Sequence, residues 1–468
     1  MSNITRRQFI KSTAAAGAAC TIGFPSLIRA RGLNEKLQVG FIATGGRAGA
    51  HTGASHKAGL QCVAFAEVDK DRWDGVLGKD GWEKAAGYTD WRKVFEKHGK
   101  EIDVVFVATP DHSHFAPTMT AVSMGIHCYT EKPLTWSVRE AQLLAAAYAK
   151  NPKVVTQQGN QGHAGKGWRQ AYEYVKAGAI GDVVEFHTWT NRPIWPQGGD
   201  RPTYTSPVPD NLDWEAWIGP AAMRPFAGPR EGDKRGRGPY HPFNWRGVVD
   251  FGSGALGDMA CHTTDGIYSI MKPGYAATAE PIVMTGPVKD QWPAGMIVKS
   301  TYRAKDGRPG FTTYWYEGKD KDGNPFMPEA PEELAMRGRK MKLPRTGNLV
   351  YGTKGKMLVE GDYWNDVRLL PLERHAKFGT PPQLLERSPG HHEEFFMACR
   401  GEKPREFSQS NFSYSGPMAA NIQLGNLCAR AGKKLELNEA GKIISDPKIN
   451  DLAWREPRNG WGPLEMNV

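Results

Sequence analysis

Residues 37–48 read LQVGFIATGGRA, an apolar run that leads into a glycine-rich turn. The run has the composition of a buried strand, and residues 47–58 then favour a helix. A second apolar run at 61–68, QCVAFAEV, carries the acid Glu67 near its end. Strand, glycine turn, helix, strand and terminal acid together predict the first βαβ unit of a parallel sheet.

The glycine turn has the spacing of a loop that binds the pyrophosphate of a dinucleotide. In such loops the backbone N–H groups approach the phosphates, and the helix N-terminus favours their charge. The three glycine positions fall on Ala43, Gly45 and Ala48, so only the middle one is glycine. Alanine is an accepted variant at the third position, whereas at the first it is a departure. Glu67 stands where an acid binds ribose hydroxyls and repels a 2′-phosphate, which favours NAD over NADP.

The alternation of strands and helices continues along the chain. A strand predicted at 102–108 ends in TPDHSH, a helix follows, and a strand predicted at 126–130 ends in EKPL. This order predicts a doubly wound parallel sheet. Thr109 and Lys132 both stand just after a strand, at the carboxyl edge where ligands bind in such sheets.

The length of 468 residues favours two folded domains. We expect a nucleotide-binding domain at 33–156, a second α/β domain at 157–434, and a tail at 435–468 that wraps over the surface. The segment GNLVYGTKGKMLVEG, 347–361, predicts a turn between strands. Other strands of the second domain are expected near 183–190, 281–287, 296–303, 311–316 and 356–360.

Residues 1–32 have the features of an export signal. A twin-arginine segment, TRRQFIK, is followed by a soft Ala/Gly-rich stretch to about Phe24, and the first acid is Glu35. The stretch is too short and too weakly apolar for a stable membrane span. We therefore expect the twin-arginine export machinery to be a partner and the protein to be periplasmic or otherwise exported. The alternative is a disordered basic arm.

The charge and the cysteines fit an exported protein that folds before export. Five of the positive charges lie in residues 1–32, and removing them leaves +5 of the +10. That value is ordinary and predicts no nucleic-acid partner. The cysteines beyond the signal form neither a disulfide framework nor a zinc pattern, so we expect them to be reduced and buried: Cys62, Cys128, Cys261, Cys399 and Cys428.

Asp258 and His262 are four residues apart, so both lie on one face if their segment is helical. Oxidation of a secondary alcohol needs a base for the hydroxyl proton and a group that stabilises the developing alkoxide. A histidine suits proton transfer near neutral pH, and a carboxylate can fix its tautomer. The alternative is a His/Asp pair on a helix surface beside a loop lysine.

Three motifs in the same order resemble the Gfo/Idh/MocA family, which includes glucose–fructose oxidoreductase and inositol dehydrogenase. They are TPDHSH at 109–114, EKPL at 131–134 and GALGDMACHTTD at 254–265. The segments GNQGH, NRPIWPQG and YHPFNWRG are similar to a large group of exported bacterial members. The resemblance implies an N-terminal Rossmann domain and a C-terminal α/β domain with a large, open, mainly antiparallel sheet. That sheet packs against the cofactor domain or another subunit, which implies a homo-oligomer.

The resemblance also implies roles for individual residues. His262 is the acid/base, Asp258 its partner, and Lys132 activates the hydroxyl. Two sites are left open: His114 could instead be structural at a helix start, and Asp265 could stand behind the site. The cofactor residues implied are Ala43, Gly45, Gly46, Arg47, Glu67, Thr109, Pro110, His114, Glu131 and Lys132. The substrate residues implied are Asn160, His163, Arg192, Trp195 and Asp265.

Two further segments have simpler interpretations. The cluster His391–Glu394 precedes an apolar run, so it predicts the start of an amphipathic helix and not a metal site. Five tryptophans between 189 and 251 could stack on sugar faces, but most are expected in the core, with one or two in the pocket: Trp189, Trp195, Trp214, Trp217 and Trp245.

The leading hypothesis is an exported NAD(P)-dependent oxidoreductase that transfers hydride to or from a ring carbon of a sugar, glycoside or cyclitol. Free NAD is scarce outside the cytoplasm, so we expect the cofactor to be tightly bound and recycled. A second hypothesis is an NAD-dependent glycosidase or lyase that oxidises its sugar transiently, although such relatives often depart from the EKP motif kept here. A third is a non-catalytic sugar sensor, which would be expected to lose Lys132 or the Asp258/His262 pair.

Overall fold

The computed structural model describes residues 36–232, 236–336, 339–458 and 460–468. The predicted export signal lies outside the described residues. Among the helices that are described, none is long and apolar enough to cross a bilayer.

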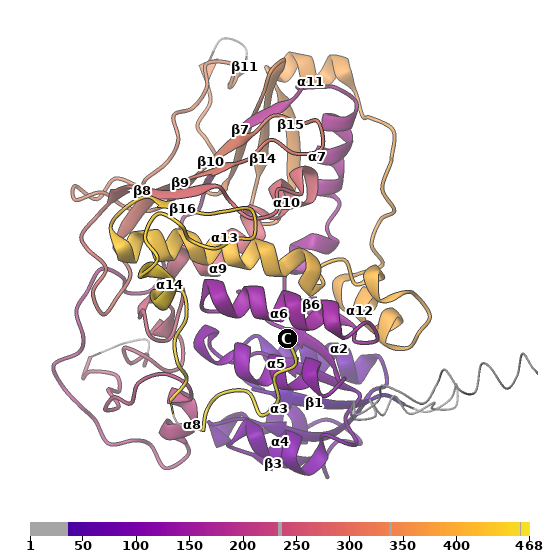
Figure 1. Ribbon diagram of the computed structural model, residues 1–468, viewed down its shortest axis with the longest axis vertical. Helices are drawn as coiled ribbons and strands as arrows, with labels where there is room; N and C mark the ends of the chain where they lie inside the picture. Colours follow the sequence, from indigo (N-terminus) through magenta and orange to yellow (C-terminus); the bar gives the residue numbers. More distant parts are fainter. Residues whose placement is uncertain (1–35, 233–235, 337–338, 459) are drawn as a thin grey trace, which may run out of the picture. The chain divides into compact units, whose positions relative to one another are not determined.

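The first sheet is the predicted doubly wound parallel sheet (Figure 1). Its six strands are all parallel and lie in the order β3-β2-β1-β4-β5-β6. Short β3 was not predicted, and β6 extends two residues beyond the domain boundary expected at 156. The strands are β1 (Gln38–Ile42), β2 (Gln61–Ala66), β3 (Ala86–Tyr88), β4 (Val104–Val107), β5 (His127–Thr130) and β6 (Thr156–Gln158).

Helices cover both faces of this sheet. One face packs against α4 (Trp91–His98), α5 (Phe115–Ser123) and α6 (Val138–Lys150), and the other packs against α2 (Ala48–Lys57) and α3 (Asp74–Leu77). The second face is completed from far along the chain by α12 (His391–Cys399). Phe395 and Phe396 of α12 stand 5.8 Å and 6.1 Å from Phe106 on β4, between ring centroids. The helix predicted to start at His391 is confirmed, and it belongs to the core of the first sheet.

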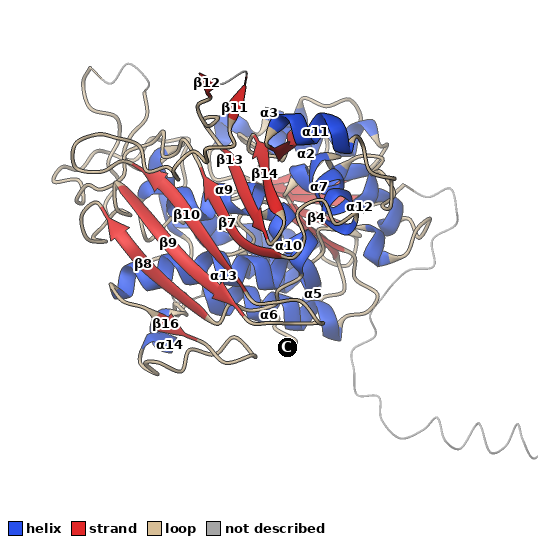
Figure 2. Ribbon diagram, turned by 90° about the horizontal axis from the view of Figure 1, so that it is seen from above, coloured by secondary structure: helices blue, strands red, loops and turns tan. Residues whose placement is uncertain are grey.

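The second sheet has eight strands and is antiparallel except where β7 and β10 pair in parallel (Figure 2). Its order is β15-β14-β13-β7-β10-β9-β8-β16. The predicted turn of 347–361 joins β13 to β14. The strands are β7 (Val183–Trp189), β8 (Thr278–Met284), β9 (Gly295–Tyr302), β10 (Phe311–Gly318), β13 (Gly347–Gly352), β14 (Gly355–Glu360), β15 (Asp366–Leu370) and β16 (Leu435–Glu436). A separate pair is formed by β11 (Ala335–Met336) and β12 (Arg339–Lys340).

Two helices join the second sheet to the first (Figure 1). The long α13 (Phe412–Ala431) packs on α6 of the first sheet and on β8 and β9 of the second. Beside it lies α9 (Gly254–Thr263), every residue of which is buried. Because α9 is enclosed all round, the side chains it carries are held in place by packing. The remaining helices are α7 (Gly167–Lys176), α8 (Trp214–Ile218), α10 (Asp265–Met271), α11 (Leu372–Phe378) and α14 (Ile449–Leu452), with short 3-10 turns at Lys70–Arg72, Asp111–Ser113, Gln161–Ala164, Asn244–Gly247 and Arg405–Phe407.

The segment 435–468 is more than a surface tail. Leu435 and Glu436 form β16 and pair with Ala279 and Thr278 at the edge of the second sheet. Ile443 and Trp461 are buried in the main core cluster. The stretch looks polar overall, so these contacts with the sheet and the core were not predicted.

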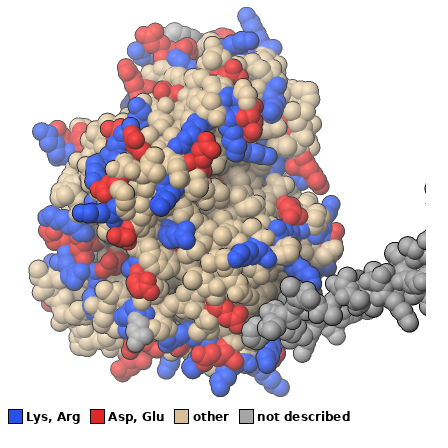
Figure 3. All heavy atoms as spheres, viewed as in Figure 1, with Lys and Arg blue, Asp and Glu red and all other residues tan. Residues whose placement is uncertain are grey.

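The cysteines and the surface charges agree with the interpretation of the sequence. The described cysteines Cys62, Cys128, Cys261, Cys399 and Cys428 are all buried and none is in a disulfide. Figure 3 shows acidic and basic side chains interspersed on the face drawn, without a large patch of one sign among the described residues there.

Ala43, which stands at the first glycine position of the fingerprint, has a backbone conformation that is unusual for alanine. Ala43 adopts φ +75°, in the left-handed region that favours glycine, and its N–H donates to the Ala66 carbonyl oxygen over 2.7 Å. The turn therefore keeps the conformation of a glycine fingerprint although it carries a side chain at this position. Such a conformation costs an L-residue about 1–2 kcal/mol.

We predict that Ala43→Gly stabilises the protein by about 0.5–1 kcal/mol, since relief of backbone strain outweighs the added freedom of the unfolded chain. The free energy of unfolding in urea measures the effect. Ala48→Gly is the matched control, because Ala48 starts α2 and glycine there costs about 0.5–1 kcal/mol. Equal destabilisation by both variants would show that Ala43 is not strained.

Candidate active site

One cavity of about 570 Å³ lies at the carboxyl ends of the strands of the first sheet. Its walls come from the loops after β1, β2, β4 and β5, from α9, from the segment 192–246, and from the turn between β14 and β15. Of the predicted site residues, the ones that line it are Ala43, Gly45, Gly46, Arg47, Glu67, Thr109, Pro110, Glu131, Lys132, Arg192, Trp195, Asp258 and His262. Those that do not are His114, Asn160, His163 and Asp265.

The nucleotide end of the cavity is the glycine turn and the acid at the end of β2. The Glu67 carboxylate accepts hydrogen bonds from the backbone N–H groups of Thr44 (2.9 Å) and Gly45 (3.0 Å), and from Asp69 (3.0 Å). These bonds hold the turn in shape. Arg72 passes close to Gly45, where a Cβ would collide with its side chain.

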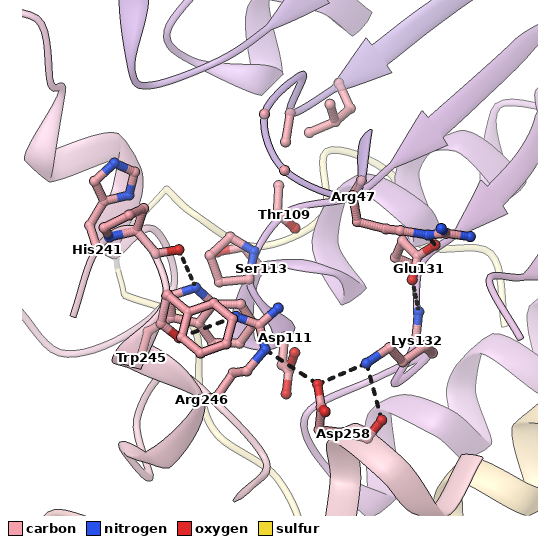
Figure 4. Close-up of a pocket in the computed structure, with 18 of the residues that line it drawn as sticks. Arg47, Thr109, Asp111, Ser113, Glu131, Lys132, His241, Trp245, Arg246 and Asp258 are labelled. Atoms are coloured by element: carbon pink, nitrogen blue, oxygen red, sulfur yellow. Dashed lines mark hydrogen bonds and ion pairs between the residues drawn. The ribbon is translucent and has the colours of Figure 1, made fainter. Parts of the chain in front are cut away.

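Two hydroxyls in the cavity wall have no partner within the described protein. They are Thr109 Oγ1, after β4, and Ser113 Oγ, one turn later. Figure 4 shows both residues at the rim of the cavity below the glycine turn. Buried hydroxyls are normally hydrogen-bonded, so both call for a ligand with polar atoms. Together with the open turn and Glu67, these residues fit a nicotinamide dinucleotide.

His114 does not line the cavity, and its place beside the nicotinamide stays a prediction. The residue is 1% exposed. Its ring nitrogens face two backbone carbonyl oxygens, of Pro133 and of Thr109, each at 2.7 Å. His114 therefore joins the loop after β4 to the EKP loop after β5, which is the structural alternative.

The reactive end of the cavity is built on an ion pair between Lys132 and Asp258 (Figure 4). Lys132 Nζ donates to Asp258 Oδ1 (2.8 Å) and to the Asp258 carbonyl oxygen (3.1 Å). Arg246 Nε donates to the same carboxylate oxygen over 3.3 Å. An ammonium has three N–H groups, so one N–H of Lys132 is left for a ligand oxygen.

The two charges keep each other ionised. Burial by itself would raise the pKa of Asp258, but Lys132 and Arg246 lower it to about 2. Burial would likewise lower the pKa of Lys132, but the Asp258 carboxylate outweighs it and the pKa is raised. Lys132 therefore remains a cation at physiological pH.

Asp258 is not the partner of His262, contrary to the expectation from their spacing. The two share α9, but the Asp258 carboxylate is taken by Lys132 and Arg246. His262 Nδ1 lies 2.9 Å from Asn160 Oδ1. The Asn160 amide is oriented in turn, since its Nδ2 donates to Asp265 Oδ1 over 2.8 Å. An amide oxygen only accepts, so His262 carries its proton on Nδ1 and leaves Nε2 for a ligand.

Asn160, His163 and Asp265 lie behind the wall rather than in it. Each is at most 3% exposed. His163 Nδ1 (2.9 Å) and the Tyr414 hydroxyl (2.7 Å) both hydrogen-bond to Asp265 Oδ1. His163 and Tyr414 thus fix the Asp265 carboxylate. Asp265 orients the Asn160 amide, and Asn160 orients the His262 ring. None of the three lines the cavity, and the Asp265 carboxylate stands behind its wall.

Burial and the positive charge of Lys132 lower the pKa of His262 to about 3. A histidine with a lowered pKa is neutral at any higher pH, so His262 Nε2 is unprotonated across the physiological range. The arrangement therefore places a neutral base and a permanent cation in one wall of a cavity that also contains a dinucleotide turn.

Glu131, the acid of the EKP motif, braces the glycine turn. Its Oε1 accepts from Arg47 Nε (3.2 Å) and lies 3.0 Å from His51 Nε2. Its Oε2 accepts from the backbone N–H of Lys132 (3.1 Å). Burial would raise the pKa of Glu131, but the hydrogen bond with His51 and the charges of His51, Arg47 and Lys132 together lower it. His51 in turn meets His392 of α12 over 2.9 Å.

Sequence reasoning missed several residues of the wall. Arg246 stands in YHPFNWRG, where its guanidinium lies 4.5 Å from the Phe243 ring and 4.4 Å from the Trp245 ring. An arginine between aromatic residues was the signal that could have identified it. Three of the five tryptophans line the cavity: Trp195, Trp217 and Trp245. Asp111 and Ser113 of TPDHSH and Gln161 of GNQGH also line the cavity, as do Asp362 and Tyr363, which lie in no motif.

We predict that His262 stays neutral and protonated on Nδ1 from about pH 8 to about pH 5. The measurement is a ¹⁵N NMR titration of histidine-labelled protein, with His262→Asn to assign the signal. In Asn160→Ala the acceptor is gone, and both neutral tautomers should be populated. A titration midpoint for His262 near the ordinary value of about 6.5 would contradict the burial argument.

Comparison with known proteins assigns both halves of the chain to one family. Residues 37–158 match the description "Oxidoreductase family, NAD-binding Rossmann fold", and residues 182–368 match "Oxidoreductase family, C-terminal alpha/beta domain". Residues 3–23 match the signal sequence of the twin-arginine translocation pathway, which directs export.

Curated relatives match over part of the chain. A levoglucosan dehydrogenase from Pseudarthrobacter phenanthrenivorans is 28% identical over 166 residues, 35% of this chain and 32% of that protein. An inositol 2-dehydrogenase from Rubrobacter xylanophilus is 28% identical over 166 residues, 34% of this chain and 45% of that protein. The chain thus spans less than half the length of these two relatives.

The structural similarity covers more of the chain than the sequence similarity does. The WlbA dehydrogenase from Bordetella pertussis, solved in complex with NADH and UDP-GlcNAcA, superposes with a TM-score of 0.56 at 14% identity. The match covers 86% of this chain and 99% of that one, which shows the shared two-sheet architecture. The chain belongs to the Gfo/Idh/MocA oxidoreductase family and carries a twin-arginine export signal.

Proposed function

We propose that this protein is an exported NAD-dependent oxidoreductase that transfers hydride between a bound nicotinamide and a ring carbon of a sugar, glycoside or cyclitol. The observation that carries the proposal is the placement of Lys132 and neutral His262 in the cavity that holds the glycine turn. Relatives named levoglucosan dehydrogenase and inositol 2-dehydrogenase, together with the structure solved with NADH, support it.

The roles of the chain's own residues follow from their contacts. In the oxidative direction a bound nicotinamide supplies the hydride acceptor. The free N–H of Lys132 donates to the substrate hydroxyl and stabilises the oxygen as it becomes negative. His262 Nε2 accepts the hydroxyl proton, while Asn160 keeps Nδ1 protonated. Asp258 acts on Lys132, whose side chain it aims and keeps charged.

The cofactor we propose is NAD, and the insertion between β7 and α9 supports its retention. The Glu67 carboxylate stands at the end of β2, where a 2′-phosphate would be repelled. The insertion is fastened beside it: Lys70 N–H donates to the Asn211 carbonyl (2.9 Å), and Asp213 N–H donates to the Val68 carbonyl (2.9 Å). His241 lies 3.2 Å from Asp69 and lines the cavity. A dinucleotide below this segment would leave slowly, which suits a protein working where free NAD is scarce.

We also propose that the chain assembles as a homo-oligomer through its second sheet. Strand β8, next to the short edge strand β16, exposes Ile282 (47%) and Val283 (39%), which are costly to leave in water. Light scattering of the purified protein would test this, and Ile282→Lys should weaken the assembly.

We predict that Lys132→Met and His262→Asn each lower the hydride-transfer rate by about 10²–10⁴-fold, the usual contribution of a positioned acid or base. Nicotinamide absorbance during single turnover with a panel of sugars, glycosides and cyclitols measures the rate. Asp258→Asn should also lower the rate, because it removes the carboxylate that aims Lys132 and keeps it charged. Product analysis separates plain oxidation from cleavage of a glycosidic bond.

The matched controls are Lys93→Met and His56→Asn, which remove an exposed lysine and an exposed histidine of the same domain. Both should retain the wild-type rate. Wild-type rates in Lys132→Met or His262→Asn would refute the proposed roles.

A further inference from the structure

The turn between β14 and β15 contributes two residues to the cavity, and no motif accounts for them. They are Asp362 and Tyr363. The Tyr363 ring stands edge-on to His262, with 4.9 Å between the ring centroids. The Tyr363 hydroxyl accepts a hydrogen bond from Gln161 Nε2 over 2.9 Å. The turn therefore reaches the reactive end of the cavity, beside the proposed base.

A buried tryptophan anchors this turn to the helix that carries His262. Trp364 is 1% exposed, and its indole N–H donates to the Thr263 carbonyl oxygen over 2.8 Å. Its backbone is left-handed, with φ +58°, which is unusual for a bulky residue. Gly167 and Gly266 leave the room it needs, because a Cβ on either would collide with Trp364. Asp362 and Tyr363 are thus held by a rigid support.

Asp362 and Gln161 bring hydrogen-bond acceptors to this wall that have no donor. Neither oxygen of the Asp362 carboxylate has a hydrogen-bond partner among the described residues, and Oδ1 is buried. Gln161 Oε1 is also buried and unpartnered, while its Nε2 is used by Tyr363. An unsatisfied buried acceptor is costly, so a bound ligand that brings donors is favoured at this wall.

Asp362 is the group of this wall that opposes a negatively charged ligand. Lys132 and Arg246 share the Asp258 carboxylate, and Arg246 Nη1 also donates to the Phe243 carbonyl oxygen over 3.1 Å. Arg192 donates to the side-chain oxygen of Asn191. None of these cations is paired with Asp362, so a ligand carboxylate at this wall would meet the unpaired charge of Asp362. Hydroxyl groups avoid that repulsion and bring donors.

We propose that Asp362, Gln161 and Tyr363 form the wall that selects the substrate, and that the substrate is a neutral ring with adjacent hydroxyls. Two neighbouring hydroxyls donate to the two oxygens of Asp362, a third donor meets Gln161 Oε1, and the Tyr363 ring covers an apolar face of the substrate ring. The inference rests on the proposed function, because the ring carbon must lie beside His262.

The experiment compares wild type with Asp362→Asn on neutral methyl glycosides, on the same glycosides lacking one hydroxyl, and on the corresponding glycosiduronates. Wild type should turn over the neutral glycosides best. In Asp362→Asn the KM for them should rise about 10–100-fold with kcat changed less than about threefold. The penalty that wild type shows for a missing hydroxyl should vanish in the variant, and the preference against glycosiduronates should shrink. If Asp362 had a purely structural role, Asp362→Asn would not selectively change the KM, the penalty for a missing hydroxyl or the preference against glycosiduronates.

Asp366→Asn is the matched control, because Asp366 begins β15 four residues later and is exposed. Tyr363→Phe keeps the ring and should have a small effect, whereas Tyr363→Ala should raise KM. An unchanged KM in Asp362→Asn, or a wild-type preference for glycosiduronates, would overturn the inference. If wild type turns over no sugar, the proposed function fails; calorimetric binding of the same glycosides then still decides whether Asp362 selects neutral rings.

Discussion

The ion pair between Lys132 and Asp258 is the contact on which the site depends. Lys132 follows β5 of the first sheet, and Asp258 lies on α9 beside the second. The pair therefore joins the cofactor side of the cavity to the side that carries His262. Removing one partner of a buried ion pair leaves an uncompensated charge and typically costs about 3–5 kcal/mol. The bonds that orient Lys132 thus also fix the loop after β5 against α9, which carries His262.

Around this pair the polar groups are arranged as two separate supports. Asp265, held by His163 and Tyr414, orients Asn160 and through it the tautomer of His262. Glu131 holds Arg47 and His51 and thereby supports the glycine turn. Because one support ends on His262 and the other on the glycine turn, the proposed base and the turn can be positioned independently. The left-handed Ala43 fits this view: the turn is held firmly enough to keep its shape without the first glycine.

The alternation of apolar runs and glycine-rich turns predicted the parallel sheet, because a buried parallel strand has a strong local signature. Short β3 has no such run and was missed. Long-range packing was also beyond sequence reasoning: α12 covers the first sheet from nearly three hundred residues away. The spacing of Asp258 and His262 predicted a shared helix correctly but not their partners, since a helix face does not decide which side chains arrive from other elements. Asp362 and Tyr363 left no signal, because a turn between two strands has no motif.

A protein that is folded before translocation can carry its bound cofactor through export. The decisive measurement is to isolate the protein after export, denature it, and identify and count the released nucleotide by mass spectrometry. The account predicts NAD(H) at close to one per chain, held beneath the insertion that is fastened to Asp69 and Val68. A protein that is empty after export and also fails to bind added NAD or NADP would contradict it.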